Sequence, residues 1–263
     1  MKPVFIFSPY WMGQPSPSRL ALARHNWRLV LVDLPPDAAP LERMGLLTRA
    51  LSEEVAAARS AGHLPVVIAG DCTFSIGVAA GLQRQTPEFT LVWFDAHGDF
   101  NTPETTPSGF IGGMPLAMLC GRGDQTIVQG AGAAVVPERH VILTDARDLD
   151  PGEKEAVAGS GLTHLPDMAD LLTLSLPDRP IYIHFDVDVL HLSDLSAVNY
   201  KAEGGPSLAL VEQVLARLAG TGQVAAVSVT MWNPELDESG TAEAVVMGLV
   251  ERLVDRLAEV SGG

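Results

Sequence analysis

The chain lacks long apolar runs and has few cysteines. Cys72 and Cys120 are its only two cysteines in 263 residues, which is too few for a disulfide framework and favours a reducing, cytoplasmic location. No apolar run reaches the roughly 18 residues that cross a bilayer, so we expect no membrane association. The first stretch, "MKPVFIFSPYWMG", lacks a small-residue cleavage site and is more typical of a first strand than of a signal peptide.

Basic residues are also scarce. The chain has 17 Lys and Arg against 32 Asp and Glu, for a formal net charge of −15. Such a surface repels phosphate backbones, so we expect no nucleic-acid partner. The acidic excess is either a solvated surface or, in part, a carboxylate cluster that bound cations neutralise.

Apolar runs alternate with amphipathic segments along the whole chain. Many of the runs are rich in β-branched residues and show no polar alternation, which indicates strands covered on both faces and hence a parallel sheet. No biased linker marks a boundary, so we expect a single α/β domain over residues 1–263. Strands are predicted at 3–8, 27–35, 65–71, 90–95, 139–145, 180–190 and 223–230, and helices at 41–62, 75–85, 151–159, 208–219 and 240–259.

Acidic clusters follow three of these strands. They are "AGDC" at 69–72, "DAHGD" at 95–99 and "HFDVD" at 184–188. Ligands of open parallel sheets bind beyond the carboxyl ends of the strands. Side chains two positions apart on an extended chain point the same way, so each of the last two clusters can converge on one point.

A shared pocket for these clusters predicts bound metal. Two like charges 4 Å apart repel by about 4 kcal/mol at an effective dielectric constant near 20, so four carboxylates need protons or cations. Oxygen ligands with one imidazole suit manganese, iron, cobalt or zinc better than calcium. A two-metal site can lower the pKa of water and supply a hydroxide for hydrolysis of an amidine, guanidine or amide. Taken alone, each motif is also typical of a salt-bridged strand end.

Four segments together resemble the ureohydrolase family, which includes arginase, agmatinase and formiminoglutamase. The resemblance covers about residues 69–250 and implies a three-layer α/β/α sandwich with a mostly parallel sheet. It also implies dimanganese chemistry that releases urea from a linear guanidinium. The segments are "AGDCTFSIG" at 69–77, "DAHGDFNTPETTPSGFIGGMP" at 95–115, "FDVDVL" at 185–190 and "WNPELDESGTAEAVV" at 232–246.

Carried over by residue, the resemblance implies two divalent ions, with Mn²⁺ as the expected metal, and six ligands: Cys72, Asp95, His97, Asp99, Asp186 and Asp188. Asp95 and Asp186 would bridge the metals. Asp99 would complete the ligand set of one metal ion. His97 and Asp188 would complete the ligand set of the other.

Cys72 stands where most relatives have a metal-binding histidine. A thiolate is a soft donor that matches manganese poorly, so this site is predicted to be weak or to select a softer ion. The alternative is a small buried cysteine at a strand end. The cysteine and the H-x-D-x-D motif are similar to the branch that includes Nω-hydroxyarginine amidinohydrolase.

Other positions concern the substrate. Asn101 and Ser108 lie where the arginase loop binds the amino-acid end of the substrate, although loop capping is the alternative. Gly112 replaces a proton-shuttle histidine. Met231, at a substrate-binding position, replaces the glutamate that holds the guanidinium.

His184 and Asp99 are the predicted catalytic residues. His184 would lie on the same strand face as Asp186 and could serve as general acid or base. The alternative is a core histidine that bonds to a neighbour.

The sequence therefore predicts a metal-dependent hydrolase of a linear amidine or guanidine C–N bond, with a small-molecule substrate and, by family analogy, a homo-oligomeric state. One alternative is an amide or formimino hydrolase of the same fold, which the neutral Met231 favours. The other is a metal-poor, non-catalytic family member.

Overall fold

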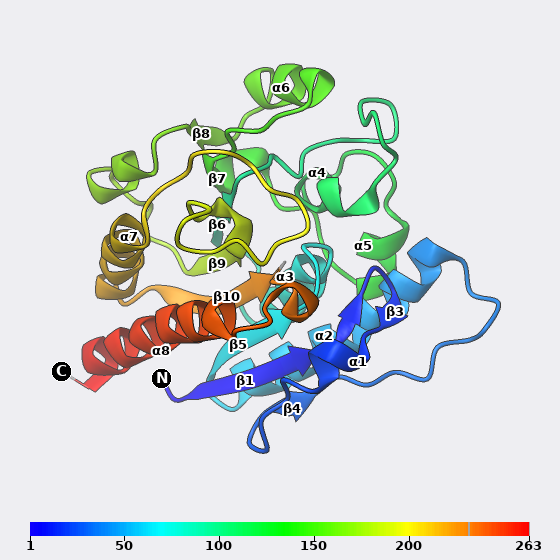
Figure 1. Cartoon of the computed structure of the whole chain (residues 1–263), viewed down its shortest axis with the longest axis horizontal. Helices are drawn as coiled ribbons and strands as arrows, with labels where there is room; N and C mark the ends of the chain where they lie inside the picture. Colours follow the sequence, from blue (N-terminus) through cyan, green and yellow to red (C-terminus); the bar gives the residue numbers. More distant parts are fainter. Residues whose placement is uncertain (231, 263) are drawn as a thin grey trace.

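The computed structural model of the protein describes residues 1–230 and 232–262. Its centre is an eight-stranded sheet in which every paired strand is parallel, in the order β4-β1-β5-β10-β9-β6-β7-β8 (Figure 1). The strands are β1 (Pro3–Ser8), β4 (Arg28–Leu29), β5 (Leu64–Ala69), β6 (Thr90–Asp95), β7 (Val141–Asp145), β8 (Thr163–Leu165), β9 (Ile181–Asp186) and β10 (Val224–Thr230).

Helices cover both faces of this sheet, which confirms the predicted three-layer architecture. Because strand side chains alternate between faces, Val66 and Val67 of β5 belong to different core clusters. The cluster around Val67 includes α2 (Pro40–Ser60), α3 (Phe74–Gln83), α4 (Pro115–Leu119) and α5 (Thr126–Ala131). The cluster around Val66 includes α7 (Leu208–Gly220) and α8 (Thr241–Gly262). The remaining helices are α1 (Pro17–Leu20) and α6 (Pro151–Ala158).

The predicted strand at 27–35 is wrong beyond its first residues, because β4 ends at Leu29. The backbone of Val32 is not paired with the sheet. Its N–H donates to the Tyr10 hydroxyl at 2.9 Å, and its carbonyl accepts from the same hydroxyl at 3.0 Å. The short strand β8, the helix α5 and the hairpin of β2 (Tyr10–Trp11) with β3 (Gln14–Pro15) were not predicted. None of the described helices is long and apolar enough to cross a membrane.

The topology brings the acidic clusters to one edge of the sheet. Strands β5, β10, β9 and β6 are consecutive neighbours, and each of them is buried along its whole length. Their carboxyl ends point the same way because all four are parallel. The segments that follow β5, β6 and β9 therefore meet above the middle of the sheet, where the sequence predicts a ligand site.

Candidate metal centre

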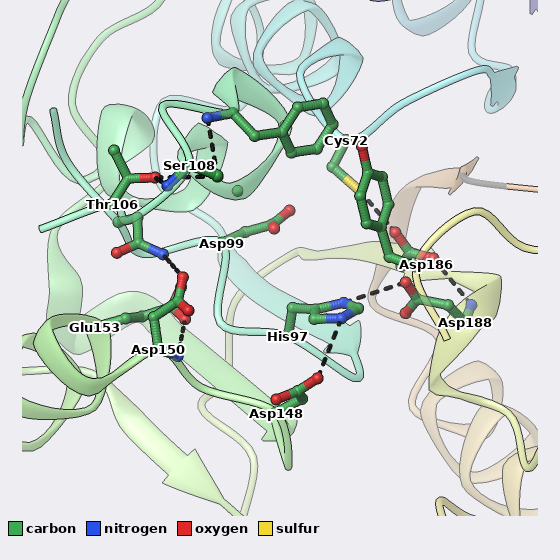
Figure 2. A pocket seen from close by; sticks show the side chains of 15 residues that line it. Cys72, His97, Asp99, Thr106, Ser108, Asp148, Asp150, Glu153, Asp186 and Asp188 are labelled. Atoms are coloured by element: carbon green, nitrogen blue, oxygen red, sulfur yellow. Dashed lines mark hydrogen bonds and ion pairs between the residues drawn. The ribbon is translucent and has the colours of Figure 1, made fainter. Parts of the chain in front are cut away.

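A cavity of about 270 Å³ opens at this edge of the sheet (Figure 2). It includes five of the six predicted metal ligands, and the sixth, Asp95, is buried beside it. The lining residues are Cys72, His97, Asp99, Asn101, Thr106, Ser108, Phe110, Gly112, Gly113, Asp148, Asp150, Glu153, Asp186, Asp188 and Tyr200.

Asp95 is the last residue of β6, and a tight turn follows it. One carboxylate oxygen of Asp95 accepts the backbone N–H of His97 at 2.7 Å, and the other accepts the indole N–H of Trp93 at 3.1 Å. The turn brings the ring of His97 back to Asp95, and Asp99 adopts a left-handed conformation with φ of 49°. The predicted convergence is thus observed, but its predicted cause is wrong: the chain turns, whereas spacing along an extended strand was expected.

Asp186 and Asp188 are also brought together by a turn and not by an extended strand. Asp186 ends β9, and Asp188 lies in a 3-10 helix at Val187–Val189. Asp186 accepts the backbone N–H of Asp188 at 2.9 Å, which closes this turn. Asp188 also joins the two loops, because it accepts the N–H of Ala96 at 3.2 Å and lies 3.2 Å from Nδ1 of His97.

These carboxylates are buried with little compensating charge. Burial and the neighbouring charge of Asp188 raise the pKa of Asp95 to about 6. Burial and nearby carboxylates raise the pKa of Asp99 and of Asp186 well above the usual range. Among the described residues no lysine or arginine forms an ion pair with any of the four acids.

His97 is the one basic partner of the cluster within the described part of the chain. Its burial favours the neutral ring, but hydrogen bonds and charges from Asp188 and Asp95 outweigh that effect and raise its pKa to about 12. Figure 2 shows the ring between Asp188 and Asp148. A single imidazolium cannot neutralise four carboxylates, so the centre has an excess of negative charge that favours cations.

Cys72 lies within the centre. Its thiol donates to Oδ2 of Asp186 at 2.8 Å and contacts the Thr230 hydroxyl at 3.2 Å. Burial, followed by the charges of the nearby carboxylates, raises the pKa of this thiol. A thiolate at this position therefore requires a positive charge beside it.

The donor atoms fit a pair of adjacent cations. One group consists of Asp95, His97 and Asp188, and the other of Cys72, Asp95 and His184. Within each group the donor atoms lie within 4.8 Å of one another, and the two groups share Asp95. In addition, a carboxylate oxygen of Asp99 is buried without a hydrogen-bond partner in the described structure. Carboxylates, imidazoles and a thiolate are ligands of divalent transition metals.

His184 is in the centre but not in the cavity. It is fully buried, and its ring contacts that of Trp93 at a tilt of 32°, with centroids 3.7 Å apart. Desolvation lowers its pKa to about 3, so the ring is neutral at pH 7. The structure therefore does not favour the predicted role of His184 as general acid.

Two of the three residues predicted to bind substrate, Asn101 and Ser108, line the cavity. Asn101 lines it, but its amide donates to Asp150 at 2.9 Å and accepts from Thr105 at 2.9 Å, so it positions Asp150. Ser108 is exposed at the rim, where it accepts the Phe110 N–H at 3.2 Å. Met231 lies outside the described residues.

Comparisons with known proteins agree with this geometry. A sequence profile of the arginase family matches residues 19–254. The chain belongs to the arginase family. It is 31% identical over 191 residues to Nω-hydroxy-L-arginine amidinohydrolase from Streptomyces lavendulae and 32% identical over 206 residues to arginase from Bacillus caldovelox. The matches cover 72% and 73% of this chain, and 63% and 69% of those proteins. The chain thus matches less than two thirds of the Streptomyces amidinohydrolase.

Solved structures from the same family confirm the fold. Arginase from Bacillus subtilis superimposes with a TM-score of 0.80 at 27% identity, covering 97% of this chain and 98% of that one. Arginase from Bacillus cereus gives a TM-score of 0.81 at 25% identity, with the same coverage. The predicted resemblance and fold class are therefore confirmed.

Some cavity residues of this arginase-family chain were not predicted. Asp148, Asp150 and Glu153 come from the segment after β7, and Tyr200 comes from the loop after β9. The first three belong to an acidic motif, "DLDPGE" at 148–153, which follows a strand as the other clusters do and offered the same signal.

Gly98 and Gly112 allow close packing around the cavity. A Cβ at residue 98 would lie 2.7 Å from Oε1 of Glu153, which accepts the Phe100 N–H at 2.8 Å. A Cβ at residue 112, where the resemblance implies a histidine in arginases, would collide with the ring of Phe110. The aromatic ring thus occupies the space that a larger residue at 112 needs.

Proposed function

We propose that this arginase-family protein is a metal-dependent hydrolase that cleaves a C–N bond of a linear amidine or guanidine and releases urea or a related product. The observation that carries the proposal is the meeting of four buried carboxylates and His97 above neighbouring strands, without a lysine or arginine paired to them among the described residues. Two divalent cations bound there would act as Lewis acids and lower the pKa of water toward neutral.

Six residues would hold the cations. Their donor set supports two divalent ions, with manganese as the family precedent and a softer ion favoured next to Cys72. The ligands we propose are Cys72, Asp95, His97, Asp99, Asp186 and Asp188.

The lining of the cavity supports a cationic substrate. Six carboxylates and no lysine or arginine line it within the described residues. Asp150, which Asn101 holds by its amide, and the exposed Asp148 lie on the side away from Cys72 (Figure 2). The rings of Phe110 and Tyr200, which contact each other at a tilt of 40° with centroids 4.8 Å apart, add apolar faces that suit a planar guanidinium. A neutral amide would not balance the negative charge of these acids.

The size of the cavity supports a small-molecule substrate, because about 270 Å³ is close to the lower end of ligand pockets. Ser108 at the rim is a candidate for a contact with the polar end of that molecule. By analogy with the family we propose a cytoplasmic homo-oligomer, which light scattering during gel filtration would test.

A screen of cation-loaded protein tests the activity. The substrates are arginine, hydroxyarginine, agmatine, guanidinobutyrate and matched amide or formimino compounds, and the products are urea and ammonia. We expect urea from at least one guanidino compound and none from the Asp188→Asn variant. Ammonia without urea would support the amide or formimino alternative, which Met231 favours on sequence grounds. A protein that binds no cation and releases neither product would refute the enzymatic proposal.

A further inference from the structure

The side chain of His184 has one buried nitrogen without a partner. Its Nδ1 lies 2.9 Å from the Ser228 hydroxyl, whereas its Nε2 has no hydrogen-bond partner among the described residues. The residue is 0% exposed, so water in the cavity does not reach this atom. An unpaired buried polar atom costs roughly 1–3 kcal/mol, so its presence requires a reason.

A chain of hydrogen bonds is satisfied when Nδ1 of His184 carries the proton. The Ser75 carbonyl can only accept, and the Tyr182 hydroxyl lies 3.4 Å from it as donor. The Ser228 hydroxyl can then donate to the oxygen of Tyr182 at 2.7 Å. Nδ1–H of His184 donates in turn to Ser228, which leaves a free lone pair on Nε2. Metal-binding histidines are oriented in this way, with one nitrogen donating to a protein group and the other facing the metal.

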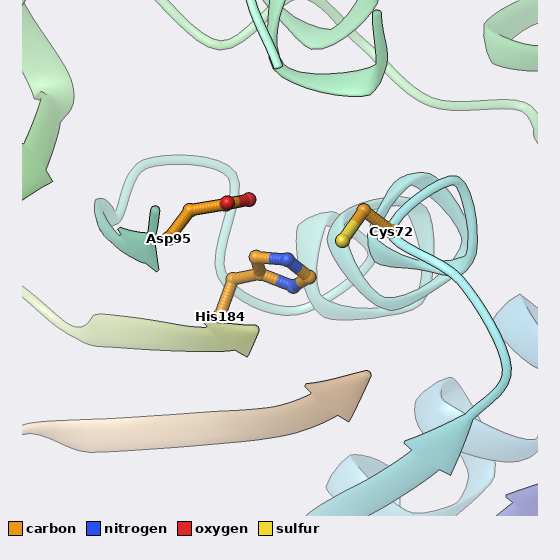
Figure 3. Close-up of side chains that lie close together, drawn as sticks. All are labelled: Cys72, Asp95 and His184. Carbon is orange, nitrogen blue, oxygen red and sulfur yellow. The ribbon is translucent and has the colours of Figure 1, made fainter. Parts of the chain in front are cut away.

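Two further donors surround this lone pair. The Sγ of Cys72, a ring nitrogen of His184 and a carboxylate oxygen of Asp95 lie within 4.8 Å of one another, and all three residues are buried. Figure 3 shows the imidazole with Asp95 on one side and Cys72 on the other. The three groups come from separate segments, after β5, at the end of β6 and within β9.

We propose that Nε2 of His184, Sγ of Cys72 and a carboxylate oxygen of Asp95 bind one cation of borderline softness, such as Zn²⁺ or Co²⁺. His184 would supply from β9 the nitrogen that residue 72 lacks in this chain. Sulfur and imidazole donors favour Zn²⁺ or Co²⁺ over Mn²⁺. The inference rests on the proposed metal centre and deepens it, because it assigns a ligand and a metal class.

Cation binding at this site would deprotonate Cys72, and the resulting metal–thiolate bond can be detected by absorption spectroscopy. When the cation binds, the S–H bond of Cys72 breaks, its proton leaves for solvent, and the sulfur electron pair forms the bond to the metal. No redox partner is needed. A thiolate bound to Co²⁺ gives a near-ultraviolet charge-transfer band, which reports on this site alone because the second group contains no sulfur.

Titration of the metal-free protein with Co²⁺ tests the ligands one at a time. We expect the charge-transfer band in wild type and in Cys120→Ser, and its loss in Cys72→Ser. His184→Ala should weaken the Co²⁺ affinity of this site by at least about 10-fold, because even the loss of an outer partner of a metal ligand costs 10–100-fold. The matched control is His140→Ala, a buried histidine on a 3-10 helix before β7, which should bind as wild type does.

Histidine-labelled wild type gives a second test that needs no variant. The chain has seven histidines. On addition of Zn²⁺, long-range ¹H–¹⁵N spectra should show two of them, His97 and His184, with metal-bound nitrogen shifts. A shift of His97 alone, or unchanged Co²⁺ binding in His184→Ala, would overturn this inference and leave the proposed function intact. Wild type that binds no divalent cation would refute both.

Discussion

Neutralising Asp186 should change the stability of the protein in opposite directions with and without metal. Asp186 is buried, and the charges of Asp188 and Asp95 act on it while no basic group pairs with it in the described structure. At a separation of about 5 Å and an effective dielectric constant near 20, one such repulsion is about 3 kcal/mol. The metal-free wild type either bears this repulsion or takes up a proton to avoid it, and both reduce its stability at pH 7.

The Asp186→Asn variant keeps the shape of the side chain and its acceptor for the Asp188 N–H. In EDTA we therefore expect the variant to be more stable than wild type by about 3 kcal/mol, or roughly 5–10 °C in midpoint for a chain of this size. With cation at 100 times its dissociation constant, wild type gains about 2.7 kcal/mol per site, and the variant gains much less because it has lost a ligand.

Denaturation curves in EDTA and in excess Mn²⁺, Co²⁺ or Zn²⁺ measure both effects. The control is Asp71→Asn, which removes a carboxylate of equal burial that accepts the N–H groups of Met12 and Thr73 outside the cluster. It should lose stability equally in both conditions. A variant at Asp186 that is less stable than wild type in EDTA, or that metal stabilises as strongly as wild type, would refute the electrostatic reasoning.

Three other changes test single features of the cavity. Gly112→His should lower the melting midpoint and add no activity, because the ring of Phe110 fills the space that the histidine needs. A second change, Phe110→Ala, should recover the midpoint, and a single variant as stable as wild type would contradict the clash. Burial raises the pKa of Glu153 from its usual 4.5 to about 7, so the folded state binds this proton more tightly and stability falls as pH rises through that window. In metal-free protein, the stability of Glu153→Gln relative to wild type should thus increase by on the order of 3 kcal/mol from pH 4.5 to 8, and a flat difference would count against this burial. Asp150→Asn should raise KM for a cationic substrate roughly 10-fold with little change in kcat, and an equal fall in kcat would place it in the chemistry instead.

The layered fold was predictable because buried strands impose a strong sequence pattern. The apolar runs at β5 and β6 have no polar alternation, and the structure covers both of their faces. The edge of the sheet was not predictable in the same way. Residues 29–32 also form an apolar run, but the Tyr10 hydroxyl binds the backbone of Val32, and this long-range contact leaves no local signal in the sequence.

The candidate site was predictable in composition and not in geometry. Asp95, Asp186 and Asp188 stand out as acids after apolar strands, and they do meet. The turns that join them depend on hydrogen bonds from Ala96 and Asp188 backbone groups, which a spacing rule for extended chains does not contain. The exchange at Gly112 was visible as a missing histidine, but the ring of Phe110 that fills the gap became visible only in three dimensions.

A column of buried polar side chains, formed by Tyr182, Ser228 and His184, lies beside Cys72 and is best explained as support for a metal ligand. In the sheet, His184 pairs in register with Ser228 on one side and with Trp93 on the other. Buried hydroxyls and an imidazole in a β-sheet core are costly unless all their polar atoms are satisfied. Among the described residues, the hydroxyls of Tyr182 and Ser228 and Nδ1 of His184 have partners in this column, whereas Nε2 of His184 has none. A ring nitrogen of His184 also lies within 4.8 Å of donor atoms of Cys72 and Asp95. If the column only filled space, apolar side chains would make the protein equally stable. A cation bound beside His184 would instead give a partner both to the Nε2 lone pair and to the Cys72 thiolate.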